Sequence, residues 1–86
     1  MHIDWPDWWS WELELTPHLM KRMVDRQFSE VDLRPMLDGA TGFRENHEEG
    51  RFVIETRHED RKWAVIVEPD PVDEVLIVVT AYPQDD

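Results

Sequence analysis

The chain has 86 residues, with nine basic against twenty acidic side chains, a net charge of −11 and no cysteine. This length allows one domain around one core, and we expect residues 1–86 to form a single domain. The lack of cysteine excludes disulfides and thiolate metal sites, so stability must come from packing. The charge argues against binding of double-stranded DNA, which needs a positive surface.

The charges are unevenly spread along the chain. All nine basic residues lie between Lys21 and Lys62, whereas every Asp, Glu, Lys or Arg in residues 1–15 and 63–86 is acidic. RNA would therefore have to bind at a local basic patch in the middle segment. The acidic ends either serve solubility or attract a basic protein partner.

The first residues have neither the basic start nor the apolar stretch of a signal peptide. The longest apolar run, Val75 to Val79, is far shorter than the roughly 20 residues that cross a bilayer. We expect a soluble, cytoplasmic protein without a membrane partner.

The N-terminal residues are rich in tryptophan. Residues 1–8 are interrupted by Pro6 and are expected to be irregular, and four of the five tryptophans lie between positions 5 and 11. These rings either cover the edge of a small core or form an exposed patch for a partner. In the second case Trp5, Trp8 and Trp9 are the partner-binding residues.

The first regular element is a strand over residues 9–16, where apolar and polar residues alternate. Thr16 and Pro17 then predict a helix start, since threonine caps an N–H and proline loses no hydrogen bond at the first position. We expect this helix to run to about Arg26. Its apolar stripe comprises Leu19, Met20, Met23 and Val24, and its opposite side carries His18, Arg22 and Asp25.

A second helix is expected from Ser29, because Asp32 three residues later forms an approximate capping box. Gly39 is expected to end it. Pro35 interrupts the helix interior, so we expect a kink or a short helix. The expected apolar contacts are Val31, Leu33, Met36 and Leu37.

Three strands follow, over Arg51–His58, Lys62–Glu68 and Glu74–Tyr82. Pairing His58 with Trp63, and Val67 with Val75, gives a sheet with one continuous apolar face, which the helices should cover. The other face then carries Glu55, Arg57, Lys62, Ala64, Ile66, Leu76, Val78, Thr80 and Tyr82. The predicted fold is α+β, in the order β-α-α-β-β-β, with two N-terminal helices packed on one face of a mostly antiparallel sheet.

Two groups of side chains have the chemistry for metal-independent RNA cleavage. His18 and Arg22 are one helical turn apart, and Arg57, Lys62, Thr80 and Tyr82 gather toward one end of the uncovered sheet face. Histidine suits proton transfer near neutral pH, and arginine and lysine stabilise a phosphorane. Lys62 is the expected substrate-binding residue. Exposed, salt-bridged surface residues are the alternative reading of the same set.

Cofactor sites are not expected. His47 and His58 stand at opposite ends of one strand region, roughly 20 Å apart at about 3.3 Å per residue, so one metal ion cannot bridge them. The chain has only three glycines and no phosphate-binding loop or nucleophile elbow. We expect neither a metal nor an organic cofactor.

The run from Thr16 to Arg26 with the segment Ser29–Leu33, and the later segments 53–57, 65–70 and 79–83, resemble a bacterial family known as domain of unknown function 4258. That family is thought to belong to the barnase–EndoU–colicin–RelE grouping of ribonuclease-like domains. The resemblance implies a RelE-like fold and a role in a toxin–antitoxin system. It also implies that His18, Arg22, Arg57, Thr80 and Tyr82 are catalytic.

Two hypotheses of function result. The first is a non-catalytic module, such as a degenerate toxin-like domain, that binds a protein partner or a second copy of itself. The second is a metal-independent RNA-cleaving domain. Whether the protein is an enzyme stays open at this stage.

Overall fold

The structure, a computed structural model, describes residues 4–84. Residues 1–3 of the expected irregular segment and the last two residues fall outside it. The radius of gyration, 12.3 Å, matches the value of about 12 Å typical of a compact domain of this length. The elements are η1 (Asp7–Ser10, a 3-10 turn), β1 (Glu12–Leu15), α1 (Pro17–Asp25), α2 (Glu30–Asp38), β2 (Gly42–Glu45), β3 (Phe52–His58), β4 (Arg61–Asp70) and β5 (Val75–Pro83).

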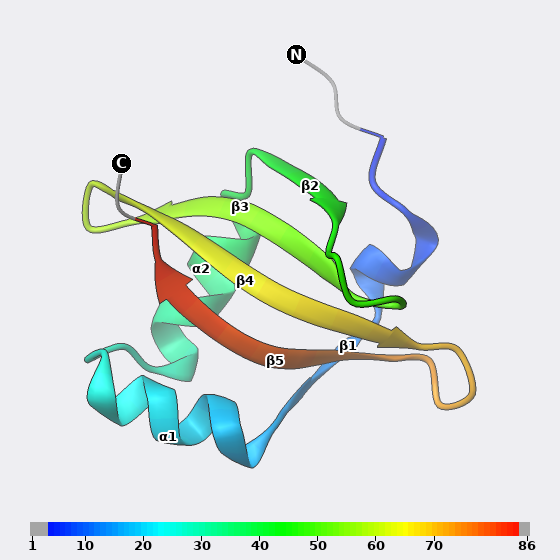
Figure 1. Ribbon diagram of the computed structural model, residues 1–86, viewed down its shortest axis with the longest axis horizontal. Coiled ribbons are helices and arrows are strands. Elements are labelled where there is room, and N and C mark those ends of the chain that lie inside the picture. Colours follow the sequence, from blue (N-terminus) through cyan, green and yellow to red (C-terminus); the bar gives the residue numbers. More distant parts are fainter. Residues whose placement is uncertain (1–3, 85–86) are drawn as a thin grey trace.

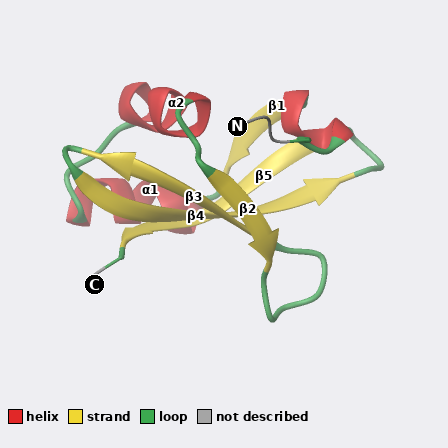
Figure 2. Ribbon diagram, turned by 90° about the horizontal axis from the view of Figure 1, so that it is seen from above, coloured by secondary structure: helices red, strands yellow, loops and turns green. Residues whose placement is uncertain are grey.

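The strands form one twisted sheet in the order β1-β5-β4-β3-β2, on which the two helices pack (Figure 1). β1 runs parallel to β5, and the other pairs are antiparallel. Helix α1 lies along β5, and α2 lies to one side of the sheet against β3 (Figure 2). The predicted α+β class and element order are confirmed, with one strand, β2, added between α2 and β3. No helix within residues 4–84 is long and apolar enough to span a membrane.

Helix α1 begins as its sequence predicts. The Thr16 hydroxyl accepts a hydrogen bond from the Leu19 N–H at 3.1 Å, and Pro17 is the first helical residue. The same hydroxyl lies 3.0 Å from the Val79 carbonyl oxygen, and Arg26 at the helix end donates to the Ala81 carbonyl at 2.6 Å. α1 therefore occupies the edge of β5 beyond the point where β1 ends.

Helix α2 begins at the predicted capping box. The Asp32 carboxylate accepts from the Ser29 backbone N–H at 2.9 Å, and Gly39 follows the last helical residue. Pro35 lies inside the helix and does not end it. Its ring is on the exposed side, where water can satisfy the carbonyl that lacks a proline N–H partner.

The main core lies between the helices and the sheet, and the predicted apolar stripes are wrong at their margins. Leu19 is fully buried and Met23 nearly so, but Met20 is 51% exposed and Val24 and Val31 are each 79% exposed. Each helix has only nine residues, and its buried side is narrower than the full apolar stripe. The core cluster comprises Leu19, Met23, Phe28, Leu33, Met36, Leu37, Ile54, Trp63, Val65, Val67, Leu76, Val78 and Ala81.

The β3–β4 hairpin is tighter than expected. His58 pairs with Arg61 rather than Trp63, because the connection is a two-residue turn in which Glu59 and Asp60 both have positive φ, 50° and 65°. This shifts the predicted register by two residues. Since side chains alternate with a period of two, the residues of each face stay on that face.

The β4–β5 pairing corrects the prediction more seriously. A β-bulge lies where Ile66 pairs with Thr80 but the next residue, Val67, pairs with Val78, which leaves Val79 unmatched. An extra residue reverses the alternation. Leu76 and Val78 are therefore buried in the main core and not on the uncovered face as predicted. Thr80 and Tyr82 lie beyond the bulge and stay on the uncovered face.

Candidate functional site

Four of the candidate catalytic and substrate-binding residues share the uncovered sheet face. Arg57 pairs with Lys62 across β3 and β4, while Thr80 and Tyr82 pair with Ile66 and Ala64 across β4 and β5. Ile66 and Ala64 belong to a second, smaller cluster that also contains Val53 and is packed by Val79 and Tyr82. Thus the register brings these four positions to one end of this face.

A pocket of about 230 Å³ lies at this end of the sheet. It is lined by Thr41, Glu55, Thr56, Arg57, Lys62 and Gln84. The Arg57 guanidinium donates to the Asp60 carbonyl at 3.3 Å, and the Glu55 carboxylate accepts from Arg44 at 3.4 Å. The pocket thus holds two cations beside a carboxylate, and neither Thr80 nor Tyr82 is among the lining residues.

His18 and Arg22 lie on a different layer. Both are on α1, whose buried residues Leu19 and Met23 belong to the main core on the helix side of the sheet. His18 is exposed, and Arg22 pairs with Asp25 at 3.1 Å, one turn along the same helix. The structure groups the four sheet residues but does not place the histidine among them.

Other arginines are held by carboxylates of the chain itself. Arg34 pairs with Glu30 at 3.0 Å, and Arg51 with Glu48 at 2.7 Å and Glu68 at 3.0 Å. The hydrogen bond to Glu68 raises the pKa of Arg51 above its ordinary value. These pairs neutralise much of the positive charge of the middle segment.

The N-terminal tryptophans pack within the chain. Trp5 stacks on Trp9 with a centroid distance of 4.1 Å, and Trp8 lies 4.9 Å from Phe52, which also neighbours Phe43. All three tryptophans are half-buried. They cover one end of the core, while part of each ring stays accessible to a partner.

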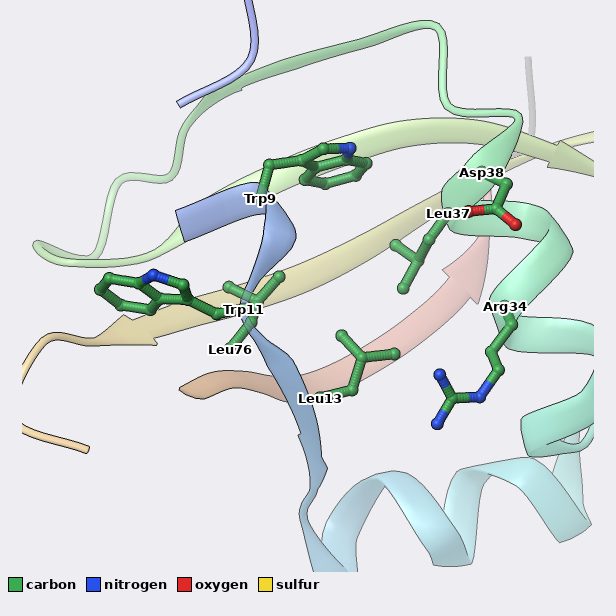
Figure 3. Close-up of a pocket in the computed structure, with 7 residues that line it drawn as sticks. All are labelled: Trp9, Trp11, Leu13, Arg34, Leu37, Asp38 and Leu76. Carbon is green, nitrogen blue, oxygen red and sulfur yellow. The ribbon is translucent and has the colours of Figure 1, made fainter. Parts of the chain in front are cut away.

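A second pocket, of about 210 Å³, opens between the N-terminal segment and α2 (Figure 3). Trp9 and Trp11 wall it, Leu13, Leu37 and Leu76 form its apolar lining, and Arg34 and Asp38 bring charge to it. Within residues 4–84 no hydrogen bond or ion pair engages the Asp38 carboxylate.

Sequence reasoning assigned no functional role to Trp11, Arg34 or Asp38. Trp11 belongs to the tryptophan-rich stretch and to the alternating strand but is not among the predicted partner-binding residues, and neither Arg34 nor Asp38 is singled out from the sequence. The sequence signal for a site is that Arg34 and Asp38 are four residues apart, which places them on the same side of α2. Which element that side faces depends on the tertiary packing.

Among the described residues, His47 and His58 do not share a group of potential metal ligands. His58 lies 3.8 Å from Glu59 and packs edge-on to Trp63 at 5.5 Å, while His47 is exposed in the loop after β2. Across residues 4–84 no group of three potential metal ligands comes together.

Comparisons were made with protein-family models, with curated proteins and with solved structures. No family model matches this chain, and no curated protein or solved structure shows significant similarity to it.

Proposed function

We propose that the chain is a non-catalytic protein-binding module that takes a basic partner. The observation that carries this proposal is the pocket walled by Trp9 and Trp11 beside the unpaired Asp38, in a chain of net charge −11. Tryptophan is enriched at interface hot spots, and a negative surface attracts a positive partner at long range. In this proposal the protein works in the cytoplasm, and a degenerate toxin-like domain of RelE-like fold would satisfy it.

The arrangement of the candidate catalytic residues also supports a binding role. General acid–base catalysis needs the proton-transfer group within about 3 Å of the reacting atoms, or one water away. His18 is on α1, whereas Arg57 and Lys62 are on the sheet face that the helices leave uncovered. Arg22 is engaged by Asp25.

Metal-independent RNA cleavage is the second candidate, and the pocket beside Arg57 and Lys62 favours it. There the two cations would bind a phosphate and stabilise its developing charge, with Thr80 and Tyr82 further along the same face. The carboxylate of Glu55 in the same pocket opposes an anion, which is why we rank this function second.

Incubation with total cellular RNA in the presence of a chelator separates the two candidates. Wild-type protein is compared with His18→Ala and Arg57→Ala. We expect intact RNA in all three samples. Cleavage by the wild type that is lost in either variant would overturn the binding module and establish a metal-independent ribonuclease.

A second experiment tests binding directly. Basic proteins recovered from a cell extract with the tagged chain are purified and remixed with it, and complex formation is measured by light scattering at low and high salt. We expect a stoichiometric complex that weakens as salt rises, because exposed charges are screened. If no purified protein binds the purified chain, the proposal is wrong.

A further inference from the structure

We propose that the pocket between β1 and α2 receives an arginine side chain of the partner, whose guanidinium pairs with Asp38 and stacks on a tryptophan ring. This inference rests on the proposed function, and it names the chemical group that the pocket recognises.

Asp38 is a carboxylate available to a ligand. Asp38 is the last residue of α2 and is exposed. Arg34, one helical turn earlier, could pair with it but instead pairs with Glu30 at 3.0 Å. A carboxylate at a helix C-terminus is disfavoured by the helix dipole, so it gains more than usual from an added cation. A guanidinium can pair with it through two parallel hydrogen bonds.

The aromatic walls favour arginine over lysine. Trp5 covers one face of the Trp9 ring at an interplanar angle of 16°, and Trp9 also lines the pocket together with Trp11. A planar guanidinium stacks on indole and is weakly hydrated, whereas an ammonium is a strongly hydrated point charge. The methylene stem of arginine would lie against Leu13, Leu37 and Leu76, seen at the centre of Figure 3.

The size of the pocket suits a single side chain. Its volume of about 210 Å³ is below the range of about 300–1,000 Å³ that is usual for small-molecule sites. A partner side chain inserted from a protein surface needs no larger cavity. The pocket is therefore better matched to one anchor residue than to a free metabolite.

The surrounding charge sets the sign of the ligand. Arg34 and Asp38 are the charged residues of the pocket lining, and Glu30 pairs with Arg34, which leaves the Asp38 carboxylate as the lining charge without a partner among the described residues. Residues 1–15 contain no base. The local field therefore favours a cationic side chain over a carboxylate.

The test is a titration of the full chain, labelled with ¹⁵N, with three blocked tripeptides: acetyl-Gly-Arg-Gly-amide and its lysine and glutamate counterparts. We expect the arginine peptide to shift the indole signals of Trp9 and Trp11 and leave that of the buried Trp63 unmoved. The lysine peptide should bind more weakly, and the glutamate peptide should not bind.

Variants of opposite charge make the result decisive. Asp38→Asn should weaken arginine-peptide binding by roughly fivefold, as for an exposed ion pair, and Arg34→Ala should strengthen it by removing a competing cation. Asp60→Asn is the matched control, because it changes the net charge equally in the β3–β4 turn, whereas the pocket is lined from the N-terminal segment, β1, α2 and the start of β5; it should leave binding unchanged. All variants are checked for folding by circular dichroism.

The opposite pattern overturns the inference. Binding of the glutamate peptide, equal binding by Asp38→Asn and wild type, or unmoved indole signals of Trp9 and Trp11 on addition of the arginine peptide would each exclude an arginine pocket here. If the chain forms a salt-sensitive complex with a basic protein but does not bind the arginine peptide, the proposed function stands and only the arginine pocket is excluded. If the chain binds the arginine peptide but forms no complex with a protein, the proposed protein-binding function is excluded instead.

Discussion

Replacing Thr56 by valine tests how α2 is fixed to the sheet. Thr56 is 3% exposed, and its hydroxyl donates a hydrogen bond to the carbonyl oxygen of Met36 in the last turn of α2. The helical donor for that carbonyl would be Ala40, but the Ala40 N–H bonds to the Leu37 carbonyl at 3.1 Å. Thr56 therefore satisfies a carbonyl that the helix end leaves without a partner.

Valine has nearly the same shape as threonine but cannot donate. The substitution leaves a buried carbonyl unsatisfied, which costs about 1–3 kcal/mol, so we expect the free energy of unfolding to fall by about 2 kcal/mol. In a domain of this size 1 kcal/mol corresponds to roughly 4–8 °C. The melting temperature should therefore fall by roughly 8–16 °C.

Urea unfolding followed by tryptophan fluorescence measures this loss, with circular dichroism as a second probe of two-state behaviour. Thr41→Val is the matched control, because the Thr41 hydroxyl donates to the Glu55 carbonyl at 3.2 Å in an exposed position. It should change stability by no more than about 0.5 kcal/mol. Equal stability of the two variants would refute the burial argument.

Three further substitutions probe the helices and the core, each by urea unfolding. Leu19→Ala should cost about 2–5 kcal/mol because Leu19 is fully buried, and an unchanged midpoint would contradict its place in the core. Asp32→Ala should cost about 1 kcal/mol through loss of the capping bond to the Ser29 N–H; a neutral effect would show that the start of α2 does not depend on this carboxylate. Pro35→Ala should instead raise stability by about 1–2 kcal/mol, because it restores a helical N–H on an exposed surface; a loss of stability would mean that the proline ring packs favourably.

Both helix starts were predictable because they depend on local chemistry. A threonine hydroxyl before Pro17, and an aspartate three residues after Ser29, satisfy the first N–H groups whatever the rest of the fold does. The α+β class followed from the order of periodicities along the chain. These features need no knowledge of contacts between distant residues.

The features that were missed depend on such distant contacts. The bulge at Val79 interrupts a run of apolar residues whose sequence gives no sign of an extra residue, so simple alternation predicts the wrong face for Leu76 and Val78. β2 has only four residues and is held by pairing with β3. The pocket at Asp38 arises where α2 packs near β1, and a single element cannot reveal it.

The four candidate residues on the sheet show how far strand pairing alone can predict a site. Side chains alternate between the two faces of a strand, and the register at these positions is shifted by an even number of residues. The prediction that they share one face therefore holds for Arg57, Lys62, Thr80 and Tyr82. The alternation along the strands does not predict which helix residues lie near this face of the sheet. His18 is on a helix that packs on the other face, and only the tertiary arrangement shows this.

The edges of the sheet bear on how a partner can bind. The edge strands β1 and β2 have four residues each and carry the charged residues Glu12, Glu14, Arg44 and Glu45, which discourages pairing with another chain. The free part of the β5 edge is occupied by α1, and Arg26, which follows the last residue of α1, donates to the Ala81 carbonyl. Strand addition is thus disfavoured at each described edge. Recognition by side chains inserted into a pocket does not need a free edge, and the tryptophan-walled pocket beside Asp38 offers that route.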